Sequence, residues 1–189
     1  MMQESVALKE WSLALRALQA GCQTMLLRKG GIVEETGAFD VVSDRFVLFP
    51  TFYHQDREIL RPDYHEWLDS EETQRRSCVS ISLYAEIVDV VSLTDPEILA
   101  NLSPLTIWTT RYLEDRLLFK PEKPLTALVV RAFSIPTVSV DVLPEYGGCL
   151  SWISLSHPID VSGRMPVLTD EAFNDARRQI LDAVSPAVI

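Results

Sequence analysis

Apolar residues in the first quarter of the chain follow two different spacings. From Leu8 to Leu18 they recur every three or four residues, which predicts a helix that ends at Gly21. Residues 24–27 and 45–49 are short apolar runs that stop at charged, glycine or proline residues. These runs predict two strands, joined by a long loop and paired as a hairpin.

The rest of the chain mixes strand and helix patterns. Residues 78–86 alternate between apolar and polar side chains, with the apolar positions from Val79 to Ala85 on one face, which is typical of a half-buried strand. The other predicted elements are helices at 95–102 and 108–117, strands at 125–133, 137–142 and 152–155, and a terminal helix that begins at Thr169.

This order of elements indicates an α+β fold. Because strands and helices do not alternate regularly, a doubly wound parallel sheet is disfavoured. We expect a mixed or mostly antiparallel sheet, with a partly closed barrel as one form of it, flanked by N-terminal, middle and C-terminal helices. With 189 residues, 47% of them hydrophobic, residues 1–189 are expected to form a single domain. Residues 56–77 are charged and aperiodic, and we expect a mobile loop there.

The distribution of apolar and cysteine residues bears on location. No run approaches the roughly 18 apolar residues of a membrane span, and the N-terminus lacks the basic and apolar regions of a signal peptide. Cys22, Cys78 and Cys149 are odd in number and widely spaced, so neither a disulfide framework nor a zinc site is expected. We predict a cytoplasmic protein without a membrane partner, with reduced and mostly buried thiols.

Charge narrows the choice of partners. The formal net charge of −10 repels nucleic acid and anionic membranes at long range. The charge is unevenly spread, however, since residues 1–31 and 105–131 are locally basic and residues 56–72 are strongly acidic. A polyanion would therefore meet favourable charge only at the basic stretches.

The motifs of several enzyme classes are missing. Glu34-Glu35-Thr36-Gly37 resembles the end of the Nudix box, but Gly30 and Gly31 stand where that box needs Arg and Glu. None of the four lysines has an acidic residue two positions before it, as restriction-type nucleases require. The phosphate-binding P-loop, the G-x-S-x-G elbow and H-E-x-x-H are also absent.

The densest group of potential metal ligands lies between residues 54 and 66. Its members are His54, Asp56, Asp63, His65 and Glu66. Imidazoles and carboxylates suit a transition metal, but their spacing matches no defined site. A hydrogen-bonded surface loop is the preferred interpretation, and we predict neither a metal nor another cofactor.

Polar and basic residues follow the two early strands. The turn Arg28-Lys29-Gly30-Gly31 offers two cations and backbone N–H groups to a phosphate, although an ordinary exit from a strand is the preferred interpretation. If the strand ends are adjacent, the candidate ligand-binding set is Arg28, Lys29, Gly30, Gly31, Tyr53, His54 and Gln55.

A second candidate surface lies on the predicted helix 108–117. Arg111, Arg116 and Lys120 could bind single-stranded nucleic acid beside the rings of Trp108 and Tyr112. The preferred interpretation is that these aromatic residues belong to the core and that Arg111 pairs with Asp115 four residues later.

Several of these strings together resemble one known family. Ala7-Leu8-Lys9-Glu10-Trp11, residues 27–32 and residues 46–55, with compatible stretches at 111–112 and 119–121, are similar to the family labelled domain of unknown function 1802, over nearly the whole chain. The resemblance implies an association with restriction–modification systems, because some members are joined to a restriction-endonuclease domain. No catalytic residues follow from it.

Three functions are compatible with these patterns. The first is a binding or accessory module in a nucleic-acid system of the restriction–modification type, a recognition partner rather than a nuclease. The second is a hydrolase with His54 as base, with or without a metal. The third is a non-catalytic interaction or oligomerisation domain whose acidic residues 56–72 meet a basic protein. Catalysis and oligomeric state are left open.

Overall fold

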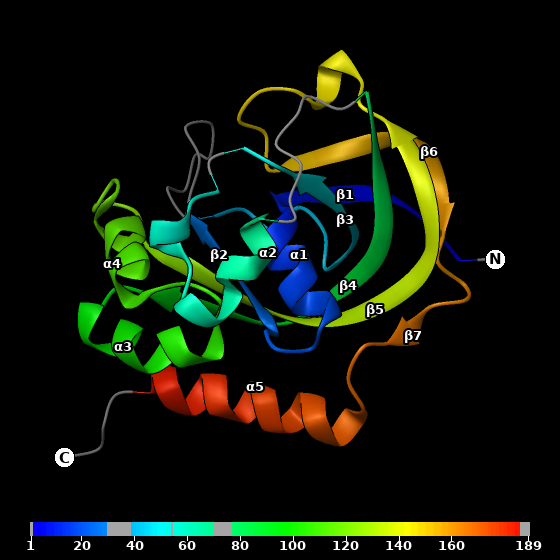
Figure 1. Cartoon of the computed structure of the whole chain (residues 1–189). Coiled ribbons are helices and arrows are strands. Elements are labelled where there is room, and N and C mark those ends of the chain that lie inside the picture. The colour runs from blue at the N-terminus through cyan, green and yellow to red at the C-terminus, as the bar shows by residue number, and fades with distance from the viewer. Residues whose placement is uncertain (1, 30–38, 54, 70–76, 186–189) are drawn as a thin grey trace.

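The computed structural model describes residues 2–29, 39–53, 55–69 and 77–185, which form an α+β fold (Figure 1). The helices are α1 (Ser12–Gln19), α2 (His65–Asp69), α3 (Leu99–Leu102), α4 (Thr110–Leu118) and α5 (Asp170–Val184). The strands are β1 (Gln3–Trp11), β2 (Met25–Lys29), β3 (Arg45–Thr51), β4 (Cys78–Leu93), β5 (Leu125–Asp141), β6 (Trp152–Asp160) and β7 (Met165–Pro166).

The strands form one mixed sheet in the order β2-β5-β4-β3-β1-β6, with β7 added to β5. β1 and β3 are parallel, and the other pairs are antiparallel. The predicted mixed sheet is therefore confirmed. Within the described residues β2 and β6 do not pair with each other, so the sheet is not closed.

The first two predicted elements need correction. The apolar residues from Leu8 to Trp11 belong to β1, and the helix begins only at Ser12. Strand β1 lies between β3 and β6 with both of its faces covered, so Ala7 and Leu8 are fully buried. A strand buried on both faces has no alternation, and its spacing can imitate a helix. The predicted end at Gly21 is confirmed, since Gly21 has a φ of 70°.

The predicted hairpin of the two early strands is also wrong. β2 pairs with β5, whereas β3 pairs with β1 and β4. The predicted strand 78–86 extends to residue 93, and the strands 125–133 and 137–142 are one strand, β5. A register shift between Ile81 and Leu83 splits the predicted apolar face. Val79 and Ile81 therefore pack in one core with Tyr84, while Leu83 packs in another.

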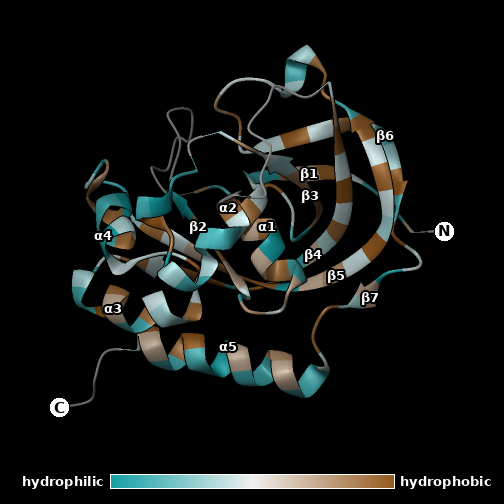
Figure 2. Cartoon of the chain, in the orientation of Figure 1, coloured by the Kyte–Doolittle hydropathy of each residue, from teal (hydrophilic) through white to brown (hydrophobic). Residues whose placement is uncertain are grey.

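The long strands β4 and β5 curve around α1, and α5 lies along the outside of this curve (Figure 1). The larger core joins α1 to the sheet, α3, α4 and the buried residues Phe173 and Ile180 of α5. Figure 2 shows the resulting alternation of apolar and polar residues along β4 and β5. Among the described helices even α5, with 15 residues, lacks the length and apolar composition of a transmembrane span.

The three cysteines are free, as expected, but exposed rather than buried. None of them lies in the interior of a helix or strand. Cys22 follows α1, Cys78 is the first residue of β4, and Cys149 lies in the loop before β6.

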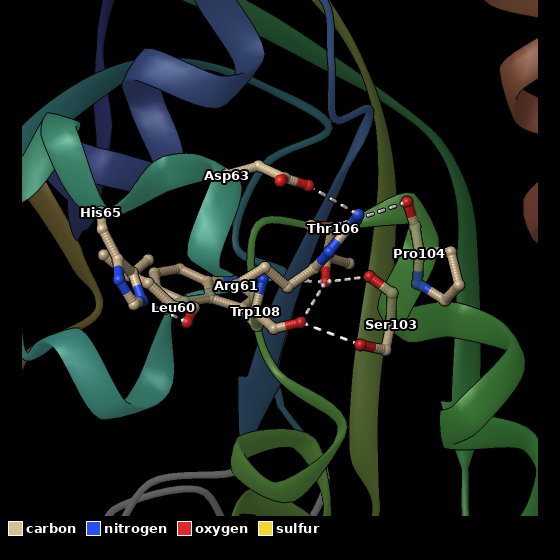
Figure 3. Close-up of polar contacts among 8 residues, drawn as sticks. All are labelled: Leu60, Arg61, Asp63, His65, Ser103, Pro104, Thr106 and Trp108. Carbon is tan, nitrogen blue, oxygen red and sulfur yellow. Dashed lines mark hydrogen bonds and ion pairs between the residues drawn. The ribbon is translucent and has the colours of Figure 1, made fainter.

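Residues 57–69, expected in a loop, form the 3-10 turns 57–59 and 62–64 and helix α2. The Arg61 guanidinium donates to the carbonyl oxygens of Pro104 at 2.9 Å and Thr106 at 3.1 Å (Figure 3). The Thr109 backbone N–H donates to the carbonyl of Ile59 at 3.0 Å. These contacts fasten the segment to the chain before α4, and residues 70–76 lie outside the described residues.

Candidate functional site

The junction of β1 and α1, formed by Glu10, Trp11 and Ser12, gathers side chains from distant parts of the chain. Arg28 of β2 donates from Nη1 to the Glu10 carboxylate at 3.0 Å and to the Lys9 carbonyl at 3.1 Å. Its Nη2 donates to the Ser151 hydroxyl at 2.7 Å. β2 begins the sheet, while β1 and β6 end it. The Arg28 side chain therefore bridges the two ends of the open sheet.

The burial of Arg28 and Glu10 indicates that their contact has a structural role. The side chain of Arg28 is 15% exposed and that of Glu10 is 11% exposed. The guanidinium also lies 5.1 Å from the centre of the Phe39 ring. A mostly buried charge needs a paired charge and hydrogen-bond acceptors, and here the protein supplies both. A phosphate contact by Arg28 stays a prediction, and it would compete with these internal acceptors.

Lys29 is also turned inward. Its side chain is buried, and its ammonium donates to the Leu117 carbonyl at 2.7 Å, in the last turn of α4. Burial lowers the pKa of Lys29, and the nearby Arg116 charge lowers it further. A cation at a helix C-terminus interacts favourably with the helix dipole. Lys29 thus fastens β2 to α4, while Gly30 and Gly31 lie outside the described residues.

Trp11 is the centre of an aromatic cluster. Its ring centroid lies 5.4 Å from that of Trp108 and 5.8 Å from that of Tyr112. Burial raises the pKa of Tyr112 to about 12. The interpretation of these rings as core is confirmed. The ion pairs of the described residues do not include the predicted pair of Arg111 with Asp115, and Arg111 is exposed.

The end of α4 exposes two apolar side chains beside two half-buried basic residues, and we call Arg116, Leu118, Phe119 and Lys120 the α4 corner. Leu118 is 65% exposed and Phe119 is 54% exposed. The Lys120 ammonium lies 5.3 Å from the centre of the Phe119 ring. Lys120 has a φ of 51°, in the left-handed region that favours glycine. Lys120 therefore lies at a position of the α4 corner where the backbone conformation disfavours a lysine.

Gln55 completes the other side of the junction. Its side-chain oxygen accepts from the Leu13 backbone N–H at 3.0 Å, and its amide nitrogen donates to the Ser12 hydroxyl at 3.0 Å. Gln55 thereby satisfies an N–H group at the start of α1, where Trp11 provides no side-chain cap. Tyr53 is exposed beyond β3, and His54 lies outside the described residues.

A cleft of about 350 Å³ opens from Ser12 between α1 and the curved sheet. One wall is α1, the other is the first part of β4, and the end of β3 with Phe52 lies between them. Its lining residues are Ser12, Leu15, Arg16, Gln19, Leu48, Pro50, Phe52, Ser80, Ser82 and Leu83. Among these described residues Arg16 is the one with a charged side chain.

The contacts of Arg16 hold its guanidinium beside the cleft. The guanidinium carbon lies 4.6 Å from the centre of the Trp67 ring, and Nη1 donates to the Trp67 carbonyl at 3.4 Å. Sequence reasoning missed Arg16, and it missed Glu10 and Ser151 as partners of Arg28. The sequence feature that points to the cleft is the alternation in residues 78–86, because it places Ser80 and Ser82 on the more polar face of the strand.

The potential metal ligands between residues 54 and 66 do not form a metal site in the described part of the chain. No group of three His, Cys, Asp or Glu side chains lies there in a suitable arrangement. His65 Nε2 bonds to the Leu60 carbonyl at 3.1 Å, and Asp63 pairs with Arg61 at 3.4 Å (Figure 3). His54 lies outside the described residues.

Most of the segments that carry the family resemblance meet at the junction. Arg28, from 27–32, contacts Glu10, and Gln55, from 46–55, contacts Ser12. Tyr112, from 111–112, packs against Trp11, and the stretch 119–121 begins at the α4 corner. The junction is thus common to strings that are far apart in sequence.

Solved structures with a similar course of the chain include two of ASCH from Zymomonas mobilis. One is a tyrosine-to-phenylalanine mutant with 14% identity, a TM-score of 0.45, and coverage of 92% of this chain and 96% of that chain. The other has 11% identity, a TM-score of 0.44 and coverage of 95% of each chain. Among curated proteins none matches the sequence. The model of one family matches residues 7–179, and this chain belongs to that family, the domain of unknown function (DUF1802).

Proposed function

We propose that the chain is a binding module for single-stranded nucleic acid and that the α4 corner, with Arg111, makes the contact. The observation that carries the proposal is the exposed Phe119 ring beside the ammonium of Lys120, which lies at a left-handed backbone position. Unfavourable backbone conformations persist where the surrounding structure fixes them, and they are concentrated at functional sites.

Each part of the corner suits one part of a nucleic-acid strand. An exposed aromatic ring can stack on any base, which contributes about 1–3 kcal/mol per base. Arg116 and Lys120 can neutralise phosphates on either side of a stacked base. The same stretch also carries Glu114, Asp115 and Glu122, and the whole chain is acidic. We therefore expect binding in the micromolar range or weaker, with a strong dependence on salt.

This role is that of an accessory protein. In a restriction–modification-type system, such a module would recognise or hold a strand for a separate nuclease, since the chain has no acidic residue two positions before any lysine. A cytoplasmic location, where thiols stay reduced, suits three free cysteines and a nucleic-acid partner.

The test is fluorescence anisotropy with labelled single strands of about 15 nucleotides, as DNA and as RNA, at several salt concentrations. A duplex of the same sequence serves as comparison. We expect single strands to bind, with an affinity that falls steeply as salt rises. Phe119→Ala combined with Lys120→Gln should weaken binding at least about tenfold, which corresponds to the loss of one stacked base.

Matched controls are available elsewhere on the surface. Leu150→Ala removes another exposed apolar side chain, and Arg178→Gln removes an exposed cation from α5. Neither change should alter binding. If no strand binds at low salt, or if the corner variant binds like the controls, the proposal fails. If the wild-type protein captures another protein but binds no strand, the interaction-domain hypothesis is favoured instead.

A further inference from the structure

We propose that residues 88–92, which we call the β4 edge, bind an extended segment of a partner protein as an added strand, and that this segment carries Lys or Arg toward both ends. The β4 edge contains no residue of the α4 corner, so the proposal goes beyond nucleic-acid binding. It rests on the open backbone of the edge, on the exposed side chains beside it and on the acidic residues at both of its ends.

Strand β4 continues beyond the point where β3 begins. β3 pairs with residues 84–86, and the final bond on this side runs from the Ile87 backbone N–H to the Asp44 carbonyl at 2.8 Å. A β-bulge between Ile87 and Asp89 lies where this pairing stops. Beyond it β5 still pairs with β4, but no residue that the structure describes bonds to the backbone of the β4 edge on the side of β3. Such an edge offers alternate N–H and C=O groups to an incoming strand.

The side chains along the β4 edge suit a pairing strand. Val88 is 42% exposed, Val90 is 54% exposed, and Ser92 is also exposed. Protected edge strands usually carry a charge that an incoming strand would bury. The charged residue of this edge is Asp89, and two hydrogen bonds from Arg177 of α5, at 2.6 and 2.7 Å, already satisfy its carboxylate. An added strand therefore buries valine side chains without an unpaired charge.

Acidic residues lie at both ends of the β4 edge. Asp44 lies at the β3 end, while Asp95 and Glu97 follow β4 at the other end, and all three are exposed. Arg45, also exposed, lies opposite Glu86 in the sheet. Cations at the ends of a bound segment would meet the three exposed carboxylates. Opposite charges across an interface raise the association rate and fix the register.

The same charges disfavour a second copy of this chain as the occupant. Two β4 edges paired antiparallel would place Asp44 of each copy beside Asp95 and Glu97 of the other, and like charges that face each other are destabilising. Each copy also carries a net charge of −10. A different protein with a basic extended segment therefore fits the β4 edge better.

The test uses a synthetic peptide of about eight residues, with alternating Val and Thr in the middle, Lys at both ends and blocked termini. Its binding to the full chain is measured by calorimetry, and NMR spectra report amide shifts and hydrogen exchange. We expect a dissociation constant of about 100 µM or lower, since main-chain bonds to an open edge provide the affinity. The shifted and more slowly exchanging amides should belong to the β4 edge.

Two further peptides separate hydrogen bonding from charge. In one, Pro replaces every Thr, which removes backbone N–H donors but keeps the Lys residues. In the other, Glu replaces Lys, which keeps the donors but reverses the charge. Each should bind at least about tenfold more weakly than the first peptide, because each loses one of the two contributions.

Variants of the protein test the same contributions. Val90→Lys places a cation on the edge and should weaken binding of the Lys peptide at least about tenfold. Val142→Lys is the matched control and should leave binding unchanged, because Val142 is also exposed but bonds to Ser77, just before the opposite end of β4. Asp44→Asn with Glu97→Gln should weaken binding about threefold and reduce its dependence on salt. Circular dichroism and thermal melting verify the fold of each variant.

Several results would overturn the proposal. These are no binding of the Lys peptide at about 1 mM, equal binding of the Pro peptide, or equal binding by wild type and by a folded Val90→Lys variant. A dimer of the wild-type protein that Val90→Lys converts to a monomer would assign the edge to a second copy instead. If Val90→Lys does not fold, the Pro peptide and the Asp44→Asn/Glu97→Gln variant decide the question.

Discussion

Replacing Arg28 by Met should destabilise the fold strongly, because Arg28 joins the two ends of an open sheet. Its guanidinium bonds to the Glu10 carboxylate, the Lys9 carbonyl and the Ser151 hydroxyl, at 2.7 to 3.1 Å. Methionine retains most of the apolar stem but none of the donors. The Glu10 charge would then remain in an environment where only 11% of its side chain is exposed.

The size of the effect follows from the burial of the pair. Removing one partner of a buried ion pair costs about 3–5 kcal/mol, mainly because the other charge stays buried and unpaired. Domains are typically stable by about 5–15 kcal/mol, so the loss is a large part of the total. Arg28→Met with Glu10→Leu removes both charges, and it should cost less than Arg28→Met alone.

The assay is urea denaturation followed by tryptophan fluorescence, with wild type, both single variants and the double variant in one thermodynamic cycle. A decrease of less than about 1 kcal/mol for Arg28→Met would refute the reasoning, since it would correspond to a solvated surface pair. Arg28 would then be available for ligands, and the phosphate-binding hypothesis for this residue would regain weight.

Three further changes test other contacts. Gly21→Ala should destabilise the protein by about 1–2 kcal/mol, because Gly21 has a φ of 70° and an added Cβ would lie 2.7 Å from Leu168 Cδ2. Thermal melting measures the change, and an unchanged melting temperature would contradict this prediction. Asp89 accepts two hydrogen bonds from Arg177, at 2.6 and 2.7 Å, and these lower its pKa. The contact therefore stabilises the fold at pH values above the unfolded-state pKa of about 3.9, and this stability is lost as the pH falls through the lower folded-state pKa. The melting temperature of Asp89→Asn should consequently depend less on pH below about pH 4 than that of wild type. Identical pH profiles of the two proteins would count against this explanation. Lys120→Gly should raise stability by up to about 1 kcal/mol by relieving the left-handed conformation, while it weakens strand binding in the anisotropy assay; a loss of stability would show that Lys120 is not under conformational strain.

Local signals in the sequence located several elements well. The terminal helix begins after Thr169, whose hydroxyl accepts the Ala172 backbone N–H at 3.2 Å, as its sequence predicts. The helix around 108–117 and the strand that begins at residue 78 were also found from spacing alone. These features depend on residues that are close together in the sequence, so a short segment is enough to predict them.

Contacts between segments that are far apart in the sequence were not predictable in the same way. The spacing of Leu8 and Trp11 suits a helix, and only the neighbours β3 and β6 make this segment a strand. Arg28 looked like an exposed phosphate ligand because the sequence does not show that Glu10 and Ser151 lie within reach. Likewise, the sequence does not show that Lys29 is buried and donates to the Leu117 carbonyl of α4.

The sequence by itself determined the fold class, the family, the C-terminal helix and the start of β4, because composition, capping residues and alternation are local properties of the chain. Only the tertiary structure decided the strand order, the Arg28 bridge and the cleft beside Arg16. These depend on which segments become neighbours, and that choice is made by the burial of apolar surface and the pairing of backbone groups across the whole molecule.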